Sequence, residues 1–234
     1  MNEIWALVPL KELAQVKNRL APVLTAELRR ELVLAMAQDV VSALLDVDLI
    51  TRVLLVTNES SVAHLFSTMG VDNFRPEQGG GLNTELEQAV DYATVQGARQ
   101  ILIVHADLPL LTPLVLGEFI AAASPDITRA AACKTSAGTN LLLTESPLRF
   151  PLVFGSNSLR AFRKMFIRQG RTLDVVKHPQ LAMDIDTPDD LHNLLHQSEA
   201  GYPVGTATRN FLVRREIDLI NDAETGRWKF IGTN

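Results

Sequence analysis

Residues 101–110, Ile101-Leu102-Ile103-Val104-His105-Ala106-Asp107-Leu108-Pro109-Leu110, decide the fold. The apolar run 101–104 indicates a strand that is buried on both faces, as in a parallel sheet. Asp107 follows at the carboxyl end of that strand. Ligands of open α/β sheets bind outside the carboxyl ends of the strands. We therefore expect Asp107 to hold a metal ion or a substrate rather than to stabilise the fold.

Short apolar runs alternate with helical patterns on both sides of this strand. Strands are expected over residues 4–8 and 53–56, and helices after Thr25, over 61–69, over 83–96 and after Thr112-Pro113. Thr25 and Thr112 are typical N-cap residues, and proline is favoured in the first helical turn. The β-α-β-α order predicts an α/β fold with a mostly parallel, Rossmann-like sheet flanked by helices.

The second half of the chain is less regular. It predicts strands over 127–133 and 140–143, a helix over 158–168, and a last helix of the core with Thr187 as N-cap and Pro188 at its first position. We expect residues 1–197 to form one domain and 198–234 a C-terminal extension. That extension either folds back on the core or mediates self-association as a homodimer, and its sequence does not choose between the two.

The bulk composition fits an enzyme of modest size. The chain has 234 residues, 47% of them hydrophobic, and a net charge of −5 with basic residues spread among acids. Neither a nucleic-acid nor a membrane surface is expected from this pattern. The single Cys133 excludes an internal disulfide and predicts a buried core thiol in a reducing compartment. The N-terminus lacks the pattern of a signal peptide, so we expect the cytoplasm.

A second acidic group follows in residues 183–191. Asp189 and Asp190 are explained as first-turn acids of the helix that Thr187 begins. Asp184 and Asp186 have no such explanation. If they lie in extended chain, their spacing of two puts both carboxylates on one side. Together with Asp107 they would offer three oxygen donors to one cation.

Two loops near the N-terminus are candidates for binding a nucleotide. Lys11, Lys17 and Arg19 follow the first strand, where a phosphate chain would lie, although solvated lysines would look the same. Residues 79–81 are three glycines that allow a close backbone approach, and Asn83 offers a donor and an acceptor to a base edge. An ordinary turn before a helix would use similar residues.

Two further loops suit a small anionic acceptor. Gly138-Thr139-Asn140 and Phe154-Gly155-Ser156-Asn157-Ser158 combine glycine with small polar side chains, which bind phosphate or carboxylate groups through backbone N–H groups. Ser158 would also serve as a helix N-cap. The histidines contribute little: His64, His178, His192 and His196 are scattered over helix surfaces and turns, and His105 is expected to face away from Asp107. No nucleophile elbow is present in the sequence, which disfavours covalent catalysis.

Seven of these segments, in this order, resemble the pattern of the CofC/FbiD guanylyltransferases, which serve the biosynthesis of the deazaflavin coenzyme F-420. The matching segments are Val8–Lys11, Lys17–Pro22, Gly81–Asn83, Asp107–Leu110, Gly138–Asn140, Phe154–Gly155 with Ser158, and Asp184–Leu191. The resemblance covers roughly residues 4 to 195. It departs from the family pattern at Asn18, Ala137 and Phe162, and Asn18 and Phe162 stand at positions that are expected to face a ligand.

The resemblance implies a nucleotide-diphospho-sugar transferase (GT-A) type fold of the MobA-like nucleotidyltransferases. It implies joining of GMP from GTP to 2-phospho-L-lactate, phosphoenolpyruvate or 3-phospho-D-glycerate, with release of pyrophosphate. Asp107, Asp184 and Asp186 would hold Mg²⁺. Lys17, Arg19 and Asp107 would serve the reaction, and the substrate contacts would come from Lys11, Gly81, Asn83, Thr139, Asn140, Gly155 and Ser158.

Two alternatives remain open. The first is a related cytidylyltransferase or sugar-phosphate nucleotidyltransferase, but those open with a glycine-rich loop where this chain has Pro9-Leu10-Lys11. The second is a catalytically silent nucleotide-binding subunit. Its sequence would have no need to retain all three candidate metal carboxylates.

Overall fold

A computed structural model describes residues 3–10, 13, 17–77, 79–124, 127–222, 225 and 227–231. Seven of its strands form one sheet in the order β3-β2-β1-β4-β6-β5-β7, and the other two form a separate hairpin. The strands are β1 (Ile4–Pro9), β2 (Ile50–Val56), β3 (Asp72–Phe74), β4 (Gln100–Val104), β5 (Thr128–Ala132), β6 (Thr139–Glu145), β7 (Leu173–Val176), β8 (Leu219–Asp222) and β9 (Arg227–Phe230).

The large sheet is mostly parallel, as predicted. β1 pairs in parallel with both β2 and β4, β2 with β3, and β5 with β7. β6 is the exception, because it runs antiparallel to β4 and β5. The carboxyl ends of β1 and β4 therefore meet the amino end of β6 at one edge of the sheet. That edge brings Asp107 and Thr139 close to each other.

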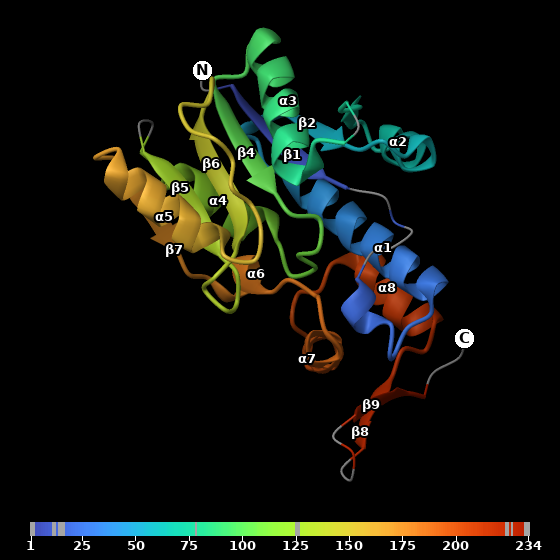
Figure 1. Ribbon diagram of the computed structural model, residues 1–234. Helices are drawn as coiled ribbons and strands as arrows, with labels where there is room; N and C mark the ends of the chain where they lie inside the picture. Colours follow the sequence, from blue (N-terminus) through green and yellow to red (C-terminus); the bar gives the residue numbers. More distant parts are fainter. Residues whose placement is uncertain are drawn as a thin grey trace.

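Helices cover both faces of the sheet (Figure 1). They are α1 (Ala26–Leu45), α2 (Ser60–Ser67), α3 (Gly81–Val95), α4 (Pro113–Ala121), α5 (Ser158–Arg168), α6 (Pro179–Ala182), α7 (Pro188–Glu199) and α8 (Thr206–Arg214), with a short 3-10 turn at Asn18–Leu20. Alternate residues of a strand serve opposite faces. In β4, Leu102 and Val104 pack with α1 and α4, whereas Ile101 and Ile103 pack with α3 and α5.

The helix starts follow the capping residues in the sequence. The side chains of Thr25 and Thr112 accept the N–H groups of Leu28 and Val115. Thr187 begins α7 in a full capping box with Asp190, whose side chain accepts the Thr187 N–H group. Such reciprocal bonds satisfy backbone donors that have no partner inside the helix. Helix α5 spans the predicted residues, and α3 begins two residues before its predicted start.

The C-terminal segment folds back on the core. Helix α8 packs against α1, and its first turn is held by Asp39, whose carboxylate accepts the N–H groups of Ala207 and Thr208 at 2.8 Å each. A Cβ at Gly205 would lie 2.2 Å from the Asp39 carboxyl carbon, so this close approach requires glycine. The hairpin of β8 and β9 then projects from the lower end of the molecule in Figure 1.

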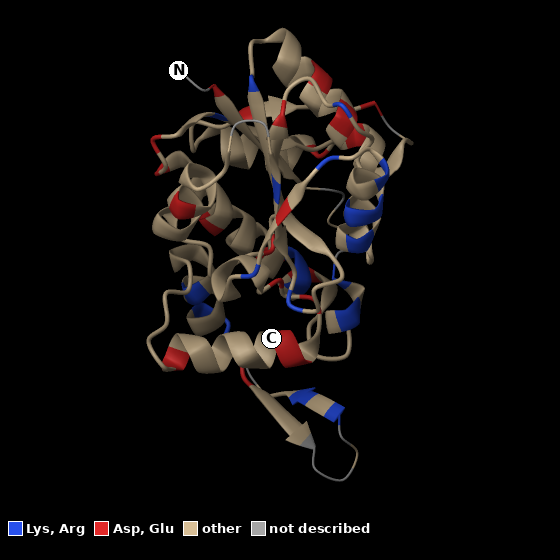
Figure 2. Cartoon of the chain, turned by 90° about the vertical axis from the view of Figure 1, so that its left-hand side faces the viewer, with Lys and Arg blue, Asp and Glu red and all other residues tan. Residues whose placement is uncertain are grey.

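Charged residues of both signs are interspersed over the side of the molecule shown in Figure 2. This distribution agrees with the mixed charge pattern of the sequence. A membrane-crossing helix is absent from the described part of the chain, because each described helix lacks the length or the apolar character that a span requires.

Candidate active site

The segments that carry the predicted carboxylates lie side by side. The N–H group of Ile185 donates to the carbonyl oxygen of Asp107 at 3.3 Å, which ties the loop after β4 to the loop before α7. Residues 183–186 form neither helix nor strand. Asp184 and Asp186 are the sequence neighbours of Ile185, which is hydrogen-bonded to Asp107. Three acids that are far apart in the sequence thus gather at one edge of the sheet.

Lys17 links two of these acids. Its Nζ atom donates to Oδ2 of Asp107 and, at 2.6 Å, to Oδ1 of Asp186. The Lys17 side chain is only 9% exposed. Burial acts to lower the pKa of Lys17, but the charges of Asp107 and Asp186 outweigh it and raise the pKa above its ordinary value. Lys17 therefore stays protonated, as a buried cation between two carboxylates.

Two carboxylate oxygens of this group have no partner. Oδ1 of Asp107 and Oδ1 of Asp184 are buried and make no hydrogen bond within the described part of the chain. Burial raises the pKa of the Asp184 carboxyl, an effect that the charge of Lys134 opposes. Burial also acts to raise the pKa of Asp107, but Lys17 brings it below its ordinary value. A buried acceptor without a donor costs folding free energy, so such atoms indicate a position where a ligand or an ion supplies the missing partner.

The donor set fits a hard divalent cation. Three carboxylates and the single ammonium group of Lys17 leave two negative charges uncompensated, and carboxylate oxygen is the ligand that Mg²⁺ prefers. Among the described residues, no three His, Cys, Asp or Glu side chains already surround one point closely enough to form a metal centre. Lys17 occupies the space between Asp107 and Asp186, and the two oxygens without a partner lie on Asp107 and Asp184.

Asp190 and Lys134 hold the acidic loop in place. Oδ2 of Asp190 accepts the N–H groups of Asp186 and Thr187 at 3.0 and 2.8 Å. Lys134 pairs with Asp190 at 2.5 Å and donates to the carbonyl oxygen of Asp184 at 2.9 Å. Both ends of the segment 184–186 are thereby fixed. The sequence explained Asp190 by capping alone, and its ion pair with a lysine at the end of β5 joins residues 56 positions apart.

The two predicted acceptor loops lie against each other. The N–H group of Leu159 donates to the Ala137 carbonyl oxygen at 3.0 Å, and a Cβ at Gly138 would lie 3.9 Å from Oγ of Ser158. Oγ1 of Thr139 is buried and has no hydrogen-bond partner among the residues that the structure describes. Gly155 has a φ of +151°, in the region that glycine favours. Ser158 is the first residue of α5, so it is not the N-cap.

Asn83 and Asn140 have structural hydrogen bonds in this arrangement. The Asn83 amide accepts the Phe154 N–H group at 2.7 Å and donates to the Phe154 carbonyl oxygen at 3.1 Å, joining the start of α3 to the acceptor loop. The Asn140 amide donates to the Leu181 carbonyl oxygen at 3.0 Å. Gly81 is the first residue of α3 and has a φ of +77°. Contacts of these three residues with a substrate stay predictions.

The basic loop is described only in part. Lys11 lies outside the described residues. Arg19 is exposed in the 3-10 turn, and it makes no ion pair with an acid in the described part of the chain. Lys17 has a φ of +50° and points at the carboxylates. Its direct contact is therefore with the acids, and a role toward phosphate stays a prediction.

Two expectations about single residues were wrong, those for Cys133 and Phe162. The ring of His105 packs on that of Phe154, with the centroids 5.4 Å apart, and burial lowers the pKa of His105, an effect that the charge of Asp107 opposes. Cys133 is only half-buried, and its thiol accepts the Gly138 N–H group at 3.1 Å. Phe162, a departure from the family pattern, does not face a ligand. It is fully buried against Phe150 and Phe154.

Buried polar atoms without a partner gather at this edge. In the described part of the chain nine such side-chain atoms occur, and four of them belong to the segments just described. Those four are Nε2 of His105, Oδ1 of Asp107, Oγ1 of Thr139 and Oδ1 of Asp184. Native proteins satisfy most buried polar groups, so a concentration of exceptions indicates a ligand site.

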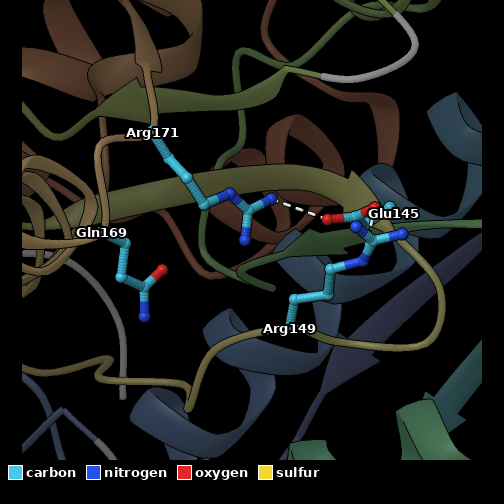
Figure 3. Close-up of a pocket in the computed structure, with 4 residues that line it drawn as sticks. All are labelled: Glu145, Arg149, Gln169 and Arg171. Carbon is cyan, nitrogen blue, oxygen red and sulfur yellow. Dashed lines mark hydrogen bonds and ion pairs between the residues drawn. The ribbon is translucent and has the colours of Figure 1, made fainter.

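A separate pocket of about 480 Å³ lies at the opposite end of the sheet. Glu145, Arg149, Gln169 and Arg171 line it (Figure 3). Glu145 pairs with Gln100, the first residue of β4, which places the pocket away from the Asp107 end. None of the predicted site residues lines it. The carboxylate of Glu145 is paired with Arg171 at 2.6 Å and with Arg149 at 3.2 Å.

The matching family model and the similar sequences are all described as guanylyl transferases. The family model described as guanylyl transferase CofC like matches residues 4–230. A phosphoenolpyruvate guanylyltransferase from Rubrobacter xylanophilus is 35% identical over 199 residues, which cover 82% of this chain and 93% of the relative. One from Roseiflexus castenholzii is 35% identical over 217 residues, covering 91% and 97%. The family match includes most of the C-terminal segment, which the resemblance in the sequence did not reach.

Comparison with solved structures supports the expected fold. A protein from Desulfovibrio desulfuricans named as a nucleotide-diphospho-sugar transferase superposes with a TM-score of 0.71 at 16% identity, covering 92% of this chain and 96% of the other. A nucleotidyl transferase from Methanothermobacter gives 0.62 at 18% identity, covering 86% and 100%. At these identities the likeness concerns the fold, whereas the sequence matches define the family. The chain belongs to the CofC-like guanylyl transferases.

Proposed function

We propose that this chain transfers GMP from GTP to a phosphorylated three-carbon acid, with release of pyrophosphate. Phosphoenolpyruvate is the first candidate for the acid, because relatives at 35% identity carry that name. 2-Phospho-L-lactate and 3-phospho-D-glycerate are the two other acids that the family resemblance implies. The product would serve coenzyme F-420 biosynthesis in the cytoplasm.

One observation carries this proposal. Buried polar atoms that have no hydrogen-bond partner in the described part of the chain lie together at the carboxyl end of β4. Two of these atoms are carboxylate oxygens and one is a hydroxyl group. The carboxylate oxygens suit a cation, and the hydroxyl group of Thr139 suits an oxygen of an anionic acceptor. A transfer between two anions needs both kinds of group in one place.

The reaction needs no activated side-chain nucleophile. An oxygen of the acceptor phosphate is already ionised at neutral pH, so it attacks the α-phosphorus of GTP directly, and the bond to the pyrophosphate oxygen breaks. Mg²⁺, held by Asp107, Asp184 and Asp186, would screen the approaching anions and neutralise the leaving pyrophosphate. The chain itself supplies position and fixed charge.

Each group of residues has a distinct task in this scheme. Lys17 orients the Asp107 and Asp186 carboxylates, and Lys134 with Asp190 fixes the segment 184–186. Thr139, Gly155 and Ser158 would bind the acceptor acid. Gly81 and Asn83 at the start of α3, together with Lys11 and Arg19, would bind GTP, because backbone N–H groups at a helix start and cations both suit phosphates.

A pyrophosphate-release assay tests the proposal. Purified protein is incubated with each of GTP, CTP, ATP and UTP against phosphoenolpyruvate, 2-phospho-L-lactate and 3-phospho-D-glycerate, with and without Mg²⁺. Release that requires GTP, one of the acids and Mg²⁺ supports the proposal. Release with CTP or with a sugar phosphate in place of the acids would indicate a different transferase. Nucleotide binding without any release would indicate a silent subunit.

A further inference from the structure

Two histidines on α7 form a cluster that the proposed reaction does not use. His192 and His196 are four residues apart, so they lie one above the other on the same face of the helix. The sequence treated these histidines as scattered. In the structure the two Nε2 atoms are 2.9 Å apart. Both side chains reach solvent, and His196 is 63% exposed.

The geometry of the pair differs from that of an in-line hydrogen bond. In such a bond the two rings would extend away from each other, and their centroids would be separated by the N···N distance plus both ring radii. The centroids are only 4.2 Å apart, and the ring planes lie at 87° to each other. The two rings are therefore not both aligned with the line that joins the nitrogens. Two imidazole nitrogens arranged in this way can serve as adjacent ligands of one cation.

Neighbouring side chains contact both rings. The ring of Trp228 lies 4.3 Å from that of His192, and its Nε1 donates to Oδ1 of Asp189 at 3.0 Å. Oε2 of Glu199 lies 3.7 Å from Nδ1 of His196, on the side of the ring away from the Nε2 pair. A carboxylate on the far nitrogen is the usual partner of a metal-bound histidine, because it orients the ring and raises its basicity.

We propose that His192 and His196 bind a divalent transition-metal cation such as Zn²⁺, Ni²⁺ or Cu²⁺. Imidazole nitrogen suits these borderline cations, whereas Mg²⁺ prefers oxygen ligands. No third His, Cys, Asp or Glu in the described ranges completes a cluster, so water fills the remaining positions of the cation. This site takes a different class of cation from the one that the carboxylates at the end of β4 would take.

Trp228 provides the readout for a test. The chain has two tryptophans, and the other, Trp5, is 3% exposed in the central sheet. Ni²⁺ is added to the tag-free, full-length protein in an excess of Mg²⁺, which occupies carboxylate sites. Tryptophan fluorescence and calorimetry follow the titration. Saturable quenching is expected, because a Ni²⁺ ion on His192 would lie beside the Trp228 ring.

The decisive variant is His196→Gln, which removes one ligand and leaves the contact between His192 and Trp228 in place. We expect it to weaken Ni²⁺ binding by at least about tenfold in both readouts, since one of two protein ligands is lost. His64→Gln is the matched control, because His64 is an exposed helical histidine on α2. The affinity of this variant for Ni²⁺ should equal that of the unmodified protein. Absence of saturable binding, or equal affinity in His196→Gln, would overturn the proposal.

Discussion

The two ends of the central sheet both hold clusters of acids and bases, yet they treat those charges differently. At the end opposite Asp107, the Glu145 carboxylate is paired with two arginines. The Arg171 guanidinium there lies over the rings of Phe150 and Phe166 at 5.4 and 5.0 Å. At the carboxyl end of β4, buried oxygens of Asp107 and Asp184 have no donor within the described part of the chain.

This difference distinguishes the Glu145 pocket from the candidate ligand site at the Asp107 end. The Glu145 pocket has the volume to hold a small molecule, but its carboxylate is already neutralised. In the described part of the chain, four buried polar atoms without a partner lie at the Asp107 end, whereas the residues that line the Glu145 pocket hold one, Nη1 of Arg171. Such atoms cost folding free energy and are retained where a ligand satisfies them. Chemistry rather than shape therefore indicates which end is functional. Mutations at the Asp107 end should lower the catalytic rate, whereas mutations at the Glu145 end should leave it unchanged.

The largest effect is expected at the carboxylates. Asp107→Asn or Asp186→Asn should lower the rate of pyrophosphate release by more than about a hundredfold, because each removes a charged ligand of the proposed cation. Circular dichroism should show an unchanged fold. Asp91→Asn, on the exposed face of α3, is the matched control and should keep the rate. A near-normal rate for Asp107→Asn in saturating Mg²⁺ would refute the metal role.

Thr139 gives the next largest effect. Its hydroxyl group is buried and has no partner in the described structure, so Thr139→Val should leave the free energy of unfolding within about 0.5 kcal/mol of the original value. The KM for the acid should rise by about tenfold or more, as expected for a lost hydrogen bond to an anion, with the KM for GTP unchanged.

Thr144→Val is the matched comparison for Thr139. The hydroxyl groups of Thr144 and Thr128 are buried and lie 3.0 Å apart in a hydrogen bond, so this change should cost about 1–3 kcal/mol of stability and leave both KM values unchanged. If Thr139→Val keeps the KM for every acid tested, the assignment of Thr139 to the acceptor is wrong.

The pH dependence of stability tests whether the Asp190 carboxylate supports the acidic segment 184–186. Burial acts to raise its pKa, but hydrogen bonds from Lys134 and from backbone N–H groups bring it below the ordinary value. Because the folded-state pKa is the lower one, the carboxylate stabilises the protein above an unfolded-state pKa of about 3.9, and this contribution is lost as the pH falls through the folded-state pKa.

The measurement is urea unfolding of the unmodified protein and Asp190→Asn at several pH values. At pH 7 the variant should be less stable by about 1–3 kcal/mol, and the difference should shrink below about pH 4. Asp91→Asn again serves as the control. A difference that is constant from neutral to strongly acidic pH would mean that the Asp190 charge does not stabilise the loop.

The smallest effect is expected at the opposite end of the sheet. Glu145→Gln should lower the free energy of unfolding by no more than about 1 kcal/mol, because partly exposed ion pairs contribute little. The catalytic rate and both KM values should stay unchanged in the pyrophosphate-release assay. A large loss of activity in this variant would remove the contrast between the two ends.

Most of the fold was predictable because its signals are local. Thr25, Thr112 and Thr187 cap their helices as expected, and β4 occupies almost the predicted residues. Several elements that escaped prediction are short: β3 has three residues, and β7 and α6 have four each. Such segments contain too little periodicity, and their pairing with β2 or β5 determines their conformation. The nine-residue helix α8 and the hairpin of β8 and β9 also escaped, because no element was assigned to the C-terminal extension.

The proximity of the candidate residues was predictable from strand ends and the family pattern, whereas their roles stay predictions. Asp107, Asp184 and Asp186 gather as expected, although Asp107 and Asp186 bind Lys17 directly. The expectation for His105 did not follow from strand alternation, because residues two positions apart in a strand share a face, and β4 ends at Val104. The pair of Lys134 and Asp190 was not visible, since only the folded chain brings these residues together.

The central claim is that Asp107, Asp184 and Asp186 bind a divalent cation at the carboxyl end of β4. The most direct test is a crystal grown with Mn²⁺ and GTP, measured near the manganese absorption edge. We expect an anomalous peak about 2.0–2.3 Å from carboxylate oxygens of Asp107 and of at least one of the other two acids. A manganese peak at any other place, with Lys17 still bridging Asp107 and Asp186, would contradict it.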